Sequence, residues 1–388
     1  MSAPEQVDVV VVGARCAGAA TAMLLARQGH RVLVLDRARK GSDTLSTHAL
    51  MRGGVVQLRR WGLLDRIVAV GTPAIRRTTF HYGDETTTVS LGEAGGVDAL
   101  YAPRRTLLDV VLVDAAVAAG AEVRFGVNVT GLDRDPDGRV VGVAGRDRHN
   151  NPVRVRARLT IGADGIRSLV ARETGAPNVR TGAGSGAVVY GHWAGLEVDG
   201  YDWYYRPGAS TGLIPTNDGE VCVFAGTSTH RFQREIGGDV RAGYLRLLKE
   251  VLADDAGRLP VANAPSRLRA FPGLPAYTRR PWGAGWALVG DAGHYLDPLT
   301  THGMTDALRD AELLAHSADA VLAGEDETRA LTTYHSRRDR ITGPMFTAAD
   351  QLAGYRWTVP GVRPLLLELS AAMSEEVRTL ADLPAGSG

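Results

Sequence analysis

Residues 7–36 read VDVVVVGARCAGAATAMLLARQGHRVLVLD, and this stretch decides the fold. The run from Val7 to Val12 is apolar apart from Asp8, as in a parallel strand that is covered on both faces. A glycine-containing turn and a helix of small residues follow, and Arg31–Leu35 supplies a second strand after the short link at residues 29–30. A strand, helix and strand in this order favour a doubly wound α/β sheet.

The turn after the first strand predicts a site for a nucleotide phosphate. Gly13 permits the tight turn, and Gly18 lets the helix approach the strand closely. Asp36 ends the second strand about 20 residues later, where an acid accepts a hydrogen bond from an adenosine ribose. Arg15 replaces the middle glycine of the usual pattern, so its guanidinium is a candidate for direct contact with phosphate. The layout predicts a bound dinucleotide but does not separate FAD from NAD.

The composition narrows the remaining classes. The chain has 388 residues, enough for one composite unit or two interleaved domains. Its net charge of +1 gives no indication of binding to nucleic acid or to an anionic membrane. Two cysteines, Cys16 and Cys222, cannot make a disulfide framework, and no metal-type spacing occurs among them. Asp8 and Arg15 interrupt the apolar stretch 7–26, which lacks the basic start of a signal peptide. We expect a soluble, cytoplasmic protein without a metal ion.

The rest of the chain alternates between helical and extended patterns. Helices are predicted over Ser46–Trp61 and Arg104–Ala119, and the chain after Val289 is mostly helical, with Pro360 and Pro364 marking breaks. Strands are predicted at 78–91 as a hairpin around residues 83–84, at 122–125, 140–143 and 153–161, as three or four strands of an antiparallel sheet within 188–227, and at 286–289.

Two later motifs join a strand to a helix through glycine and aspartate. Residues 162–170 read GADGIRSLV, and residues 290–294 read GDAGH. Taken singly, Asp164 and Asp291 are equally well explained as helix caps. In order with the first turn, however, they resemble the motifs of the class A flavoprotein monooxygenases, the para-hydroxybenzoate hydroxylase-like group. The resemblance continues through Asp297–Pro298 and residues 302–311.

The resemblance assigns roles to particular residues. It implies that Asp164 lies near the flavin and nicotinamide, that Asp291 holds the ribityl chain, and that Arg105 contacts the FAD phosphates or ribityl chain. It also implies that residues 302–311 lie against the flavin ring. The residues that we predict for the FAD site are Gly13, Arg15, Cys16, Ala17, Gly18, Asp36, Arg37, His48, Arg105, Val129, Asp164, Gly165, Gly290, Asp291, Pro298, Gly303, Met304 and Thr305.

The same resemblance implies an architecture and two cofactors. We expect an FAD-binding Rossmann-like domain of the GR2 type, with an inserted, mostly antiparallel substrate-binding sheet and C-terminal helices. We assign residues 1–75, 98–180 and 275–388 to the first domain, and residues 76–97 and 181–274 to the second. FAD is the expected cofactor, and NAD(P)H is the expected transient co-substrate.

Residues 208–215, GASTGLIP, bear on the reaction. Related halogenases carry two tryptophans in this strand and a tunnel lysine, and related prenyl reductases carry aromatic residues there. This chain has Ser210 and Gly212 instead, and neither of its two lysines, Lys40 and Lys249, is well placed. Small residues leave room for an aromatic or polycyclic substrate, with Tyr190, His192, Trp203, Tyr205 and Phe224 available to line a cavity or simply to pack the sheet.

We therefore expect hydroxylation by molecular oxygen through a C4a-hydroperoxyflavin, with NAD(P)H as the reductant. The candidate catalytic bases are His48, His192, Tyr205 and His302, although a lone histidine is more often a capping or packed residue. A flavin-dependent reductase or dehydrogenase and a halogenase remain alternatives on the same fold. A flavin-binding regulator without turnover is a further alternative from another class.

Overall fold

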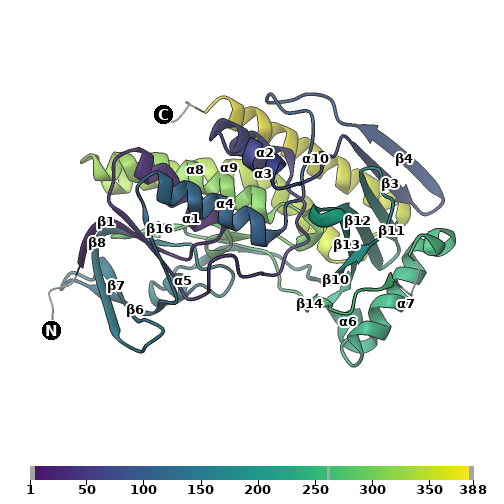
Figure 1. The fold of residues 1–388 in the computed structure, drawn as a ribbon, viewed down its shortest axis with the longest axis horizontal. Helices are drawn as coiled ribbons and strands as arrows, with labels where there is room; N and C mark the ends of the chain where they lie inside the picture. Colours follow the sequence, from purple (N-terminus) through teal and green to yellow (C-terminus); the bar gives the residue numbers. More distant parts are fainter. Residues whose placement is uncertain (1–4, 260–262, 384–388) are drawn as a thin grey trace.

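The stretch that opens the sequence analysis folds as predicted. β1 (Glu5–Val12) leads into α1 (Cys16–Arg27), and β2 (Val32–Asp36) lies parallel to β1. In this computed structural model, which describes residues 5–259 and 263–383, the unit forms the centre of a mixed α/β fold with C-terminal helices (Figure 1). The predicted fold class is confirmed.

The first sheet contains β1 and β2 and is largely parallel. Its strand order is β16-β17-β8-β1-β2-β5, with β7 added beside β8 and β6 beside β7. The further strands are β5 (Glu122–Phe125), β6 (Asn128–Arg134), β7 (Val140–Arg146), β8 (Pro152–Gly162), β16 (Trp282–Gly283) and β17 (Trp286–Leu288). The sequence analysis missed β6, whose mixed polar pattern and two irregularities in register against β7 hide the usual alternation.

The second sheet is antiparallel except where β3 meets β11. Its order is β14-β10-β13-β12-β11-β3-β4. The strands are β3 (Arg77–Tyr82), β4 (Glu85–Ser90), β10 (Gly186–Ala194), β11 (Tyr201–Arg206), β12 (Ala209–Pro215), β13 (Glu220–Ser228) and β14 (Arg269–Phe271). Both predicted segments of the substrate-binding domain, 76–97 and 181–274, thus contribute strands to one sheet. A small third sheet joins β9 (Asn178–Thr181), β15 (Tyr277–Arg279) and β18 (His294–Tyr295).

Helices cover both sheets. Figure 1 shows α1, α4 (Arg105–Ala118), α8 (Gly303–Leu322) and α9 (Glu327–Ala353) along one face of the first sheet. α6 (Thr229–Glu235) and α7 (Val240–Leu252) cover the outer face of the second sheet and close a separate core there. The remaining helices are α2 (Arg52–Arg60), α3 (Leu64–Ala69), α5 (Leu169–Glu173) and α10 (Val359–Ala381).

Two helix predictions need correction. The helix expected from Ser46 begins only at Arg52, because His48 has a left-handed backbone (φ 69°) that a helix cannot contain. Pro360 and Pro364 do not break the last helices, since both lie inside α10. Pro360 stands in the first turn, where its missing amide would have no partner within the helix, and Pro364 lies one turn later.

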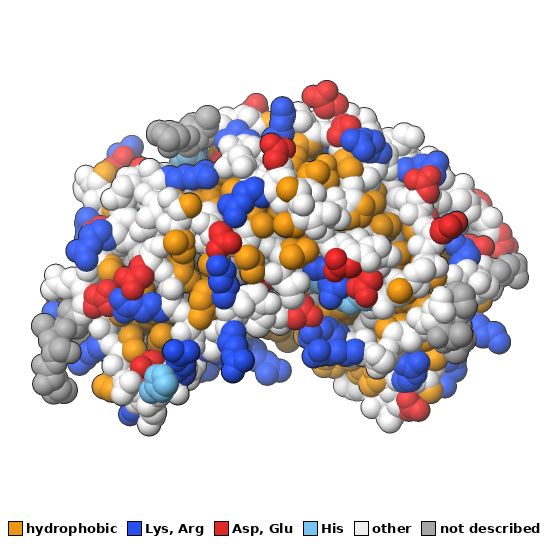
Figure 2. All heavy atoms as spheres, in the orientation of Figure 1, with side chains coloured by type: hydrophobic (Ala, Val, Ile, Leu, Met, Phe, Trp, Pro, Cys, Tyr) orange, Lys and Arg blue, Asp and Glu red, His pale blue; other side chains and the backbone are white. Residues whose placement is uncertain are grey.

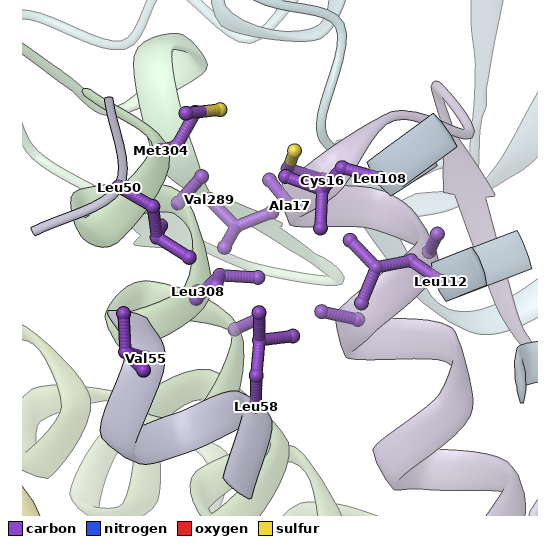
Figure 3. Close-up of a cluster of buried hydrophobic side chains, with 14 of the residues drawn as sticks. Cys16, Ala17, Leu50, Val55, Leu58, Leu108, Leu112, Val289, Met304 and Leu308 are labelled. Atoms are coloured by element: carbon purple, nitrogen blue, oxygen red, sulfur yellow. The ribbon is translucent and has the colours of Figure 1, made fainter. Parts of the chain in front are cut away.

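The main core lies where four helices meet. Figure 3 shows side chains of α1, α2, α4 and α8 pointing toward one another, including Cys16, Leu58, Leu108 and Leu308. This core continues to the inner face of the second sheet, so both sheets share one apolar interior. Among the described residues, no helix has the length and apolar character needed to cross a membrane.

Candidate FAD and substrate site

The sheet topology brings the predicted motifs to one edge. β17, β8, β1 and β2 are parallel neighbours, so their carboxyl ends lie side by side. Gly13 follows β1, Asp36 ends β2, Asp164 follows β8 and Asp291 follows β17. In open α/β sheets a ligand binds outside the carboxyl ends of the strands. Three motifs that are far apart in sequence therefore meet at the position where a dinucleotide is expected.

Glycine is required where these motifs touch. Gly13 has φ +106°, and a Cβ there would lie 2.4 Å from the Ala163 carbonyl oxygen. A Cβ on Gly18 would lie 1.9 Å from the carbonyl oxygen of Gly13. Only glycine permits these approaches. Gly165 and Gly303 are different, since a Cβ on either would meet no described atom within 4 Å. These two glycines face open space, as backbone beside a bound ligand would.

Asp36, at the end of β2, stabilises the turn between β1 and α1, which we call the phosphate turn. Its Oδ2 accepts a hydrogen bond from the Ala14 amide at 2.7 Å, and its Oδ1 accepts one from the Ala38 amide at 2.7 Å. A carboxylate oxygen can accept two hydrogen bonds, so this arrangement leaves capacity for a ribose hydroxyl. The neighbouring Arg37 is exposed.

Asp164 holds the start of α5. Its Oδ2 accepts from the Leu169 amide at 2.6 Å and from the Val170 amide at 3.2 Å, while the Ser168 hydroxyl donates to Oδ1. Burial raises the pKa of Asp164, and these donors oppose the rise. The capping role weighed from the sequence is thus present, and it does not exclude contact with a ligand at the same strand end.

Asp291 is the acid without a protein donor. No hydrogen bond or ion pair from the described residues reaches its carboxylate, although its main-chain carbonyl accepts from the Tyr277 hydroxyl at 2.6 Å. Burial raises the pKa of Asp291 to about 7, the charge of Asp306 adds to the rise and Arg105 opposes it. A nearly buried carboxyl group needs hydrogen-bond donors. The hydroxyls of a ribityl chain would supply them, so the residues present fit FAD.

An aspartate that the sequence analysis did not single out connects the phosphate turn to α4. Asp109 accepts from Arg105 Nε at 3.0 Å, from Arg15 Nη1 at 3.1 Å and from the Cys16 thiol at 3.1 Å. Burial raises the pKa of Cys16, so its thiol stays protonated near neutral pH. The four-residue spacing of Arg105 and Asp109 on a helix is the signal that could have revealed the pair.

The remaining predicted FAD residues lie on three elements. Val129 is buried in β6, in the core beneath the first sheet. Met304 and Thr305 lie in the first turn of α8, where Thr305 Oγ1 accepts from the Met51 amide at 3.2 Å. Gly290 precedes Asp291, and a Cβ there would come within 3.0 Å of the Ala17 side chain. These contacts pack the last motif directly against the phosphate turn.

The loop before α8 also touches the second sheet. Asp297 Oδ2 accepts from the Gly186 amide at the start of β10 at 2.7 Å, and burial raises the pKa of Asp297 to about 6. Pro298 lies beside it and lines a cavity of about 10 Å³ between loop and sheet. Besides these residues, the cavity is lined by Thr47, Ala187, Val188, Phe224, Gly226, Leu299 and Tyr355. A space of this size holds about one water molecule.

Two predicted histidines meet on the inner face of the second sheet. His48 Nε2 and His192 Nε2 lie 3.0 Å apart, and the neighbouring Tyr190 hydroxyl accepts from the Ser46 amide at 2.9 Å. Burial and the charge of Arg104 lower the pKa of His192 to about 4. Burial and His192 lower the pKa of His48. Both imidazoles are therefore neutral near pH 7, and the buried Nδ1 of His48 has no hydrogen-bond partner among the described residues.

The other two candidate bases have different surroundings. Tyr205 is buried against Tyr82 and Trp357, and burial raises the pKa of its phenol far above the usual value. His302 is fully buried; although burial lowers its pKa, Glu376 and Asp306 raise it to about 10. A phenol and an imidazolium that keep their protons cannot accept one at neutral pH.

His302, Asp306 and Glu376 are also close enough to be considered as metal ligands. Each ring nitrogen of His302 already faces a carboxylate, and Arg309 Nη1 contacts both acids. The carboxylates of Asp306 and Glu376 are therefore already paired with the positively charged side chains of His302 and Arg309, where a metal ion would otherwise bind. We interpret this group as a buried network of ion pairs.

The surface reflects the two-part construction. On the face drawn in Figure 2, the molecule is hollowed between the part that carries β6 and β7 and the part that carries α6 and α7. The fold and the convergent strand ends define a dinucleotide-binding α/β protein with a separate, mostly antiparallel second sheet.

The family follows from comparison with known proteins. Residues 6–349 match the family described as FAD binding domain, and the chain belongs to that family. It is an FAD-dependent oxidoreductase, and FAD is its cofactor; NAD(P)H is the co-substrate typical of this family.

Similar proteins catalyse different reactions. A digeranylgeranylglycerophospholipid reductase from Methanocella arvoryzae is 25% identical over 84% of this chain and 81% of its own length. Monooxygenase cfoF from Aspergillus candidus is 28% identical over 89% and 93%, respectively. Among solved structures, PqsL, a probable FAD-dependent monooxygenase from Pseudomonas aeruginosa, has a TM-score of 0.79 at 21% identity, covering 93% of this chain and 100% of its own. The myxobacterial halogenase CndH has a TM-score of 0.79 at 22% identity, covering 97% and 96%.

Proposed function

We propose that this protein is an FAD-dependent monooxygenase that hydroxylates an aromatic or polycyclic small molecule, with NAD(P)H as reductant and molecular oxygen as co-substrate. The observation that carries the proposal is the inner face of the second sheet. There Tyr190, Trp203 and Phe224 share one apolar cluster with Met304 of the predicted flavin loop. Aromatic side chains beside a flavin suit a flat, apolar substrate.

The small residues of β12 give this face its shape. Gly212 lies opposite Trp203 and Phe224, and a Cβ at residue 212 would approach Phe224 to 2.5 Å. Ser210 is held by the Tyr355 hydroxyl at 2.9 Å. The small residues of the strand therefore let Trp203 and Phe224 pack directly over Gly212, and these two side chains belong to the apolar face on which we propose that a bound ring lies.

FAD would be held by the strand ends, with Asp291 accepting hydrogen bonds from its ribityl hydroxyls and Asp36 from its adenosine ribose. When bound and reduced, it supplies the activation of oxygen. The chain contributes the apolar inner face of the second sheet, which would help to exclude water, and the free amides at the start of α8, near Gly303, would favour negative charge beside the ring.

On that face, His48 and His192 are the groups we propose for a polar substituent of the substrate. Both are neutral, so the unpartnered Nδ1 of His48 can accept a hydrogen bond from a phenol or enol, and His192 can pass a proton along the pair. A hydroxyl polarised in this way makes the ring carbon richer in electrons. Tyr205 and His302 are not part of this proposal, because their raised pKa values keep both groups protonated at neutral pH.

The positions of the lysines favour hydroxylation over halogenation. Lys40 is half exposed and forms an ion pair with Asp114 on α4. Lys249 is exposed on α7, on the outer side of the second sheet. Neither borders the inner face, where a halogenase of this superfamily would need its lysine. Cys16 and Cys222 are buried and form no disulfide, which suits a reducing compartment, so we propose the cytoplasm as the location.

The decisive experiment follows the oxygen atom. Aromatic and polyketide-like compounds are screened for stimulation of NAD(P)H oxidation by the purified holoenzyme, and hits are incubated under ¹⁸O₂. We expect one product oxygen to carry the label, with the second oxygen released as water. A product that is reduced or dehydrogenated and carries no label would identify a reductase or dehydrogenase instead. Addition of chloride or bromide to the product would identify a halogenase.

A further inference from the structure

The last described helix reaches the start of α8 through one buried acid. Glu376 lies on α10 with its carboxylate 1% exposed. Its Oε2 lies 2.9 Å from His302 Nε2, and its Oε1 lies 2.9 Å from Arg309 Nη1. Oε2 also lies close to α2, because a Cβ on Gly53 would come within 3.1 Å of it. Glu376 thus occupies the space where α2, α8 and α10 meet.

The imidazole that Glu376 contacts is fixed from both sides. His302 Nδ1 lies 3.0 Å from Asp306 Oδ1, so each ring nitrogen faces a carboxylate. His302 is the residue that precedes α8, where the helix dipole opposes a positive charge. Because the ring is fully buried and its charge is unfavourable at that position, it depends on both acids. Asp306 belongs to α8 itself, whereas Glu376 belongs to α10 and so links the ring to a second helix.

The position of His302 determines where the free amides of α8 begin. The preceding Thr301 has a left-handed backbone (φ 53°), and the following Gly303 is exposed to open space. The chain therefore turns sharply at Thr301 and directs the first amides of α8 outward. A shift of the His302 ring would carry these amides with it, because the ring is attached to the first residue of the turn.

We propose that Glu376 is a positioning residue that acts through His302 to hold the first amides of α8 against the bound flavin. The inference rests on the proposed assignment of Gly303 and Met304 to the flavin site, and it goes beyond that assignment by giving the C-terminal helix a part in it. Glu376 does not touch the cofactor. It affects the flavin only indirectly, by fixing His302 and with it the first amides of α8.

The test compares two neighbouring glutamates. Glu376→Gln removes the charge and keeps the shape. Glu375→Gln is the matched control, since Glu375 is exposed and pairs with Arg378 on the surface. The readouts are the Kd of the flavin-free protein for FAD, followed by fluorescence, and the midpoint potential of the bound flavin. For Glu376→Gln we expect FAD binding at least about tenfold weaker and a shifted potential. Glu375→Gln should behave like the wild type.

A purely structural role would give a different result. It would lower the melting temperature of Glu376→Gln and leave the FAD Kd and the flavin potential at their wild-type values, which would overturn the proposal. If Glu376→Gln does not fold, Gly53→Ala keeps every charge and is measured in the same way; its added Cβ would lie 3.1 Å from the same carboxylate and 3.0 Å from Thr305 Cγ2. Folded Gly53→Ala protein with unchanged Kd and potential would overturn the proposal equally. The amount of hydroxylated product is not a readout here, so failure of the proposed reaction would leave the test valid.

Discussion

Replacing Asp291 with asparagine should stabilise the flavin-free protein while weakening its affinity for FAD. Burial raises the pKa of this carboxyl from 3.8 to about 7. Because the folded pKa lies above the unfolded one, stability is lost as the pH rises from 3.8 to about 7 and stays reduced above that range. Three pKa units correspond to about 4 kcal/mol, and allowing for the partial exposure of Asp291 we expect a gain of about 2 kcal/mol at pH 8.

Urea unfolding of the flavin-free proteins at two pH values provides the assay. At pH 8 the asparagine variant should have the larger free energy of unfolding. At pH 5 its advantage over the wild type should fall below about half of the value at pH 8, since the folded wild-type carboxyl is then largely protonated. FAD titrations should show the opposite order of affinities, and wild-type binding should weaken by about fivefold between pH 7 and pH 6, where binding must first remove a proton from Asp291. An asparagine variant that is less stable at pH 8, or equally shifted at both pH values, would refute the reasoning.

Three further predictions concern the two ligand sites. Gly303→Ala should leave the melting temperature of the flavin-free protein within about 2 °C of wild type and reduce FAD affinity about fivefold or more, because the added Cβ would meet no described atom within 4 Å and would face the proposed flavin site. Calorimetry and FAD titration check this. His192→Phe should keep FAD bound and release more hydrogen peroxide per NAD(P)H consumed, and an unchanged yield of product would exclude His192 from substrate binding. Replacing both Lys40 and Lys249 with alanine should leave turnover within about twofold of wild type, whereas a halogenase would lose its activity.

The local sequence pattern predicted the fold well where the choice of residues depends directly on burial. The apolar run of β1 and the glycines at residues 13 and 18 suffice for the strand, turn and helix, because parallel strands are buried on both faces and the turn admits no side chain. The chain order of the motifs then predicted their meeting at one sheet edge, which the parallel topology confirms. β6 escaped notice because its irregular register breaks the two-residue alternation.

The site was less predictable, because its chemistry depends on partners that are distant in sequence. His302 was a reasonable candidate base from its place before α8, but Glu376, 74 residues later, helps to keep it protonated. Asp109 gains its importance from Arg15, 94 residues away. Only the tertiary structure reveals which acid faces which base, and hence which histidines are neutral.

The bond between Asp297 and the Gly186 amide has a consequence for engineering. It ties Gly186, the first residue of β10, to the loop before α8, so the second sheet and the predicted flavin loop are held together at this point. An insertion near residue 186 would break this tie, and we expect altered substrate preference to come with altered flavin retention.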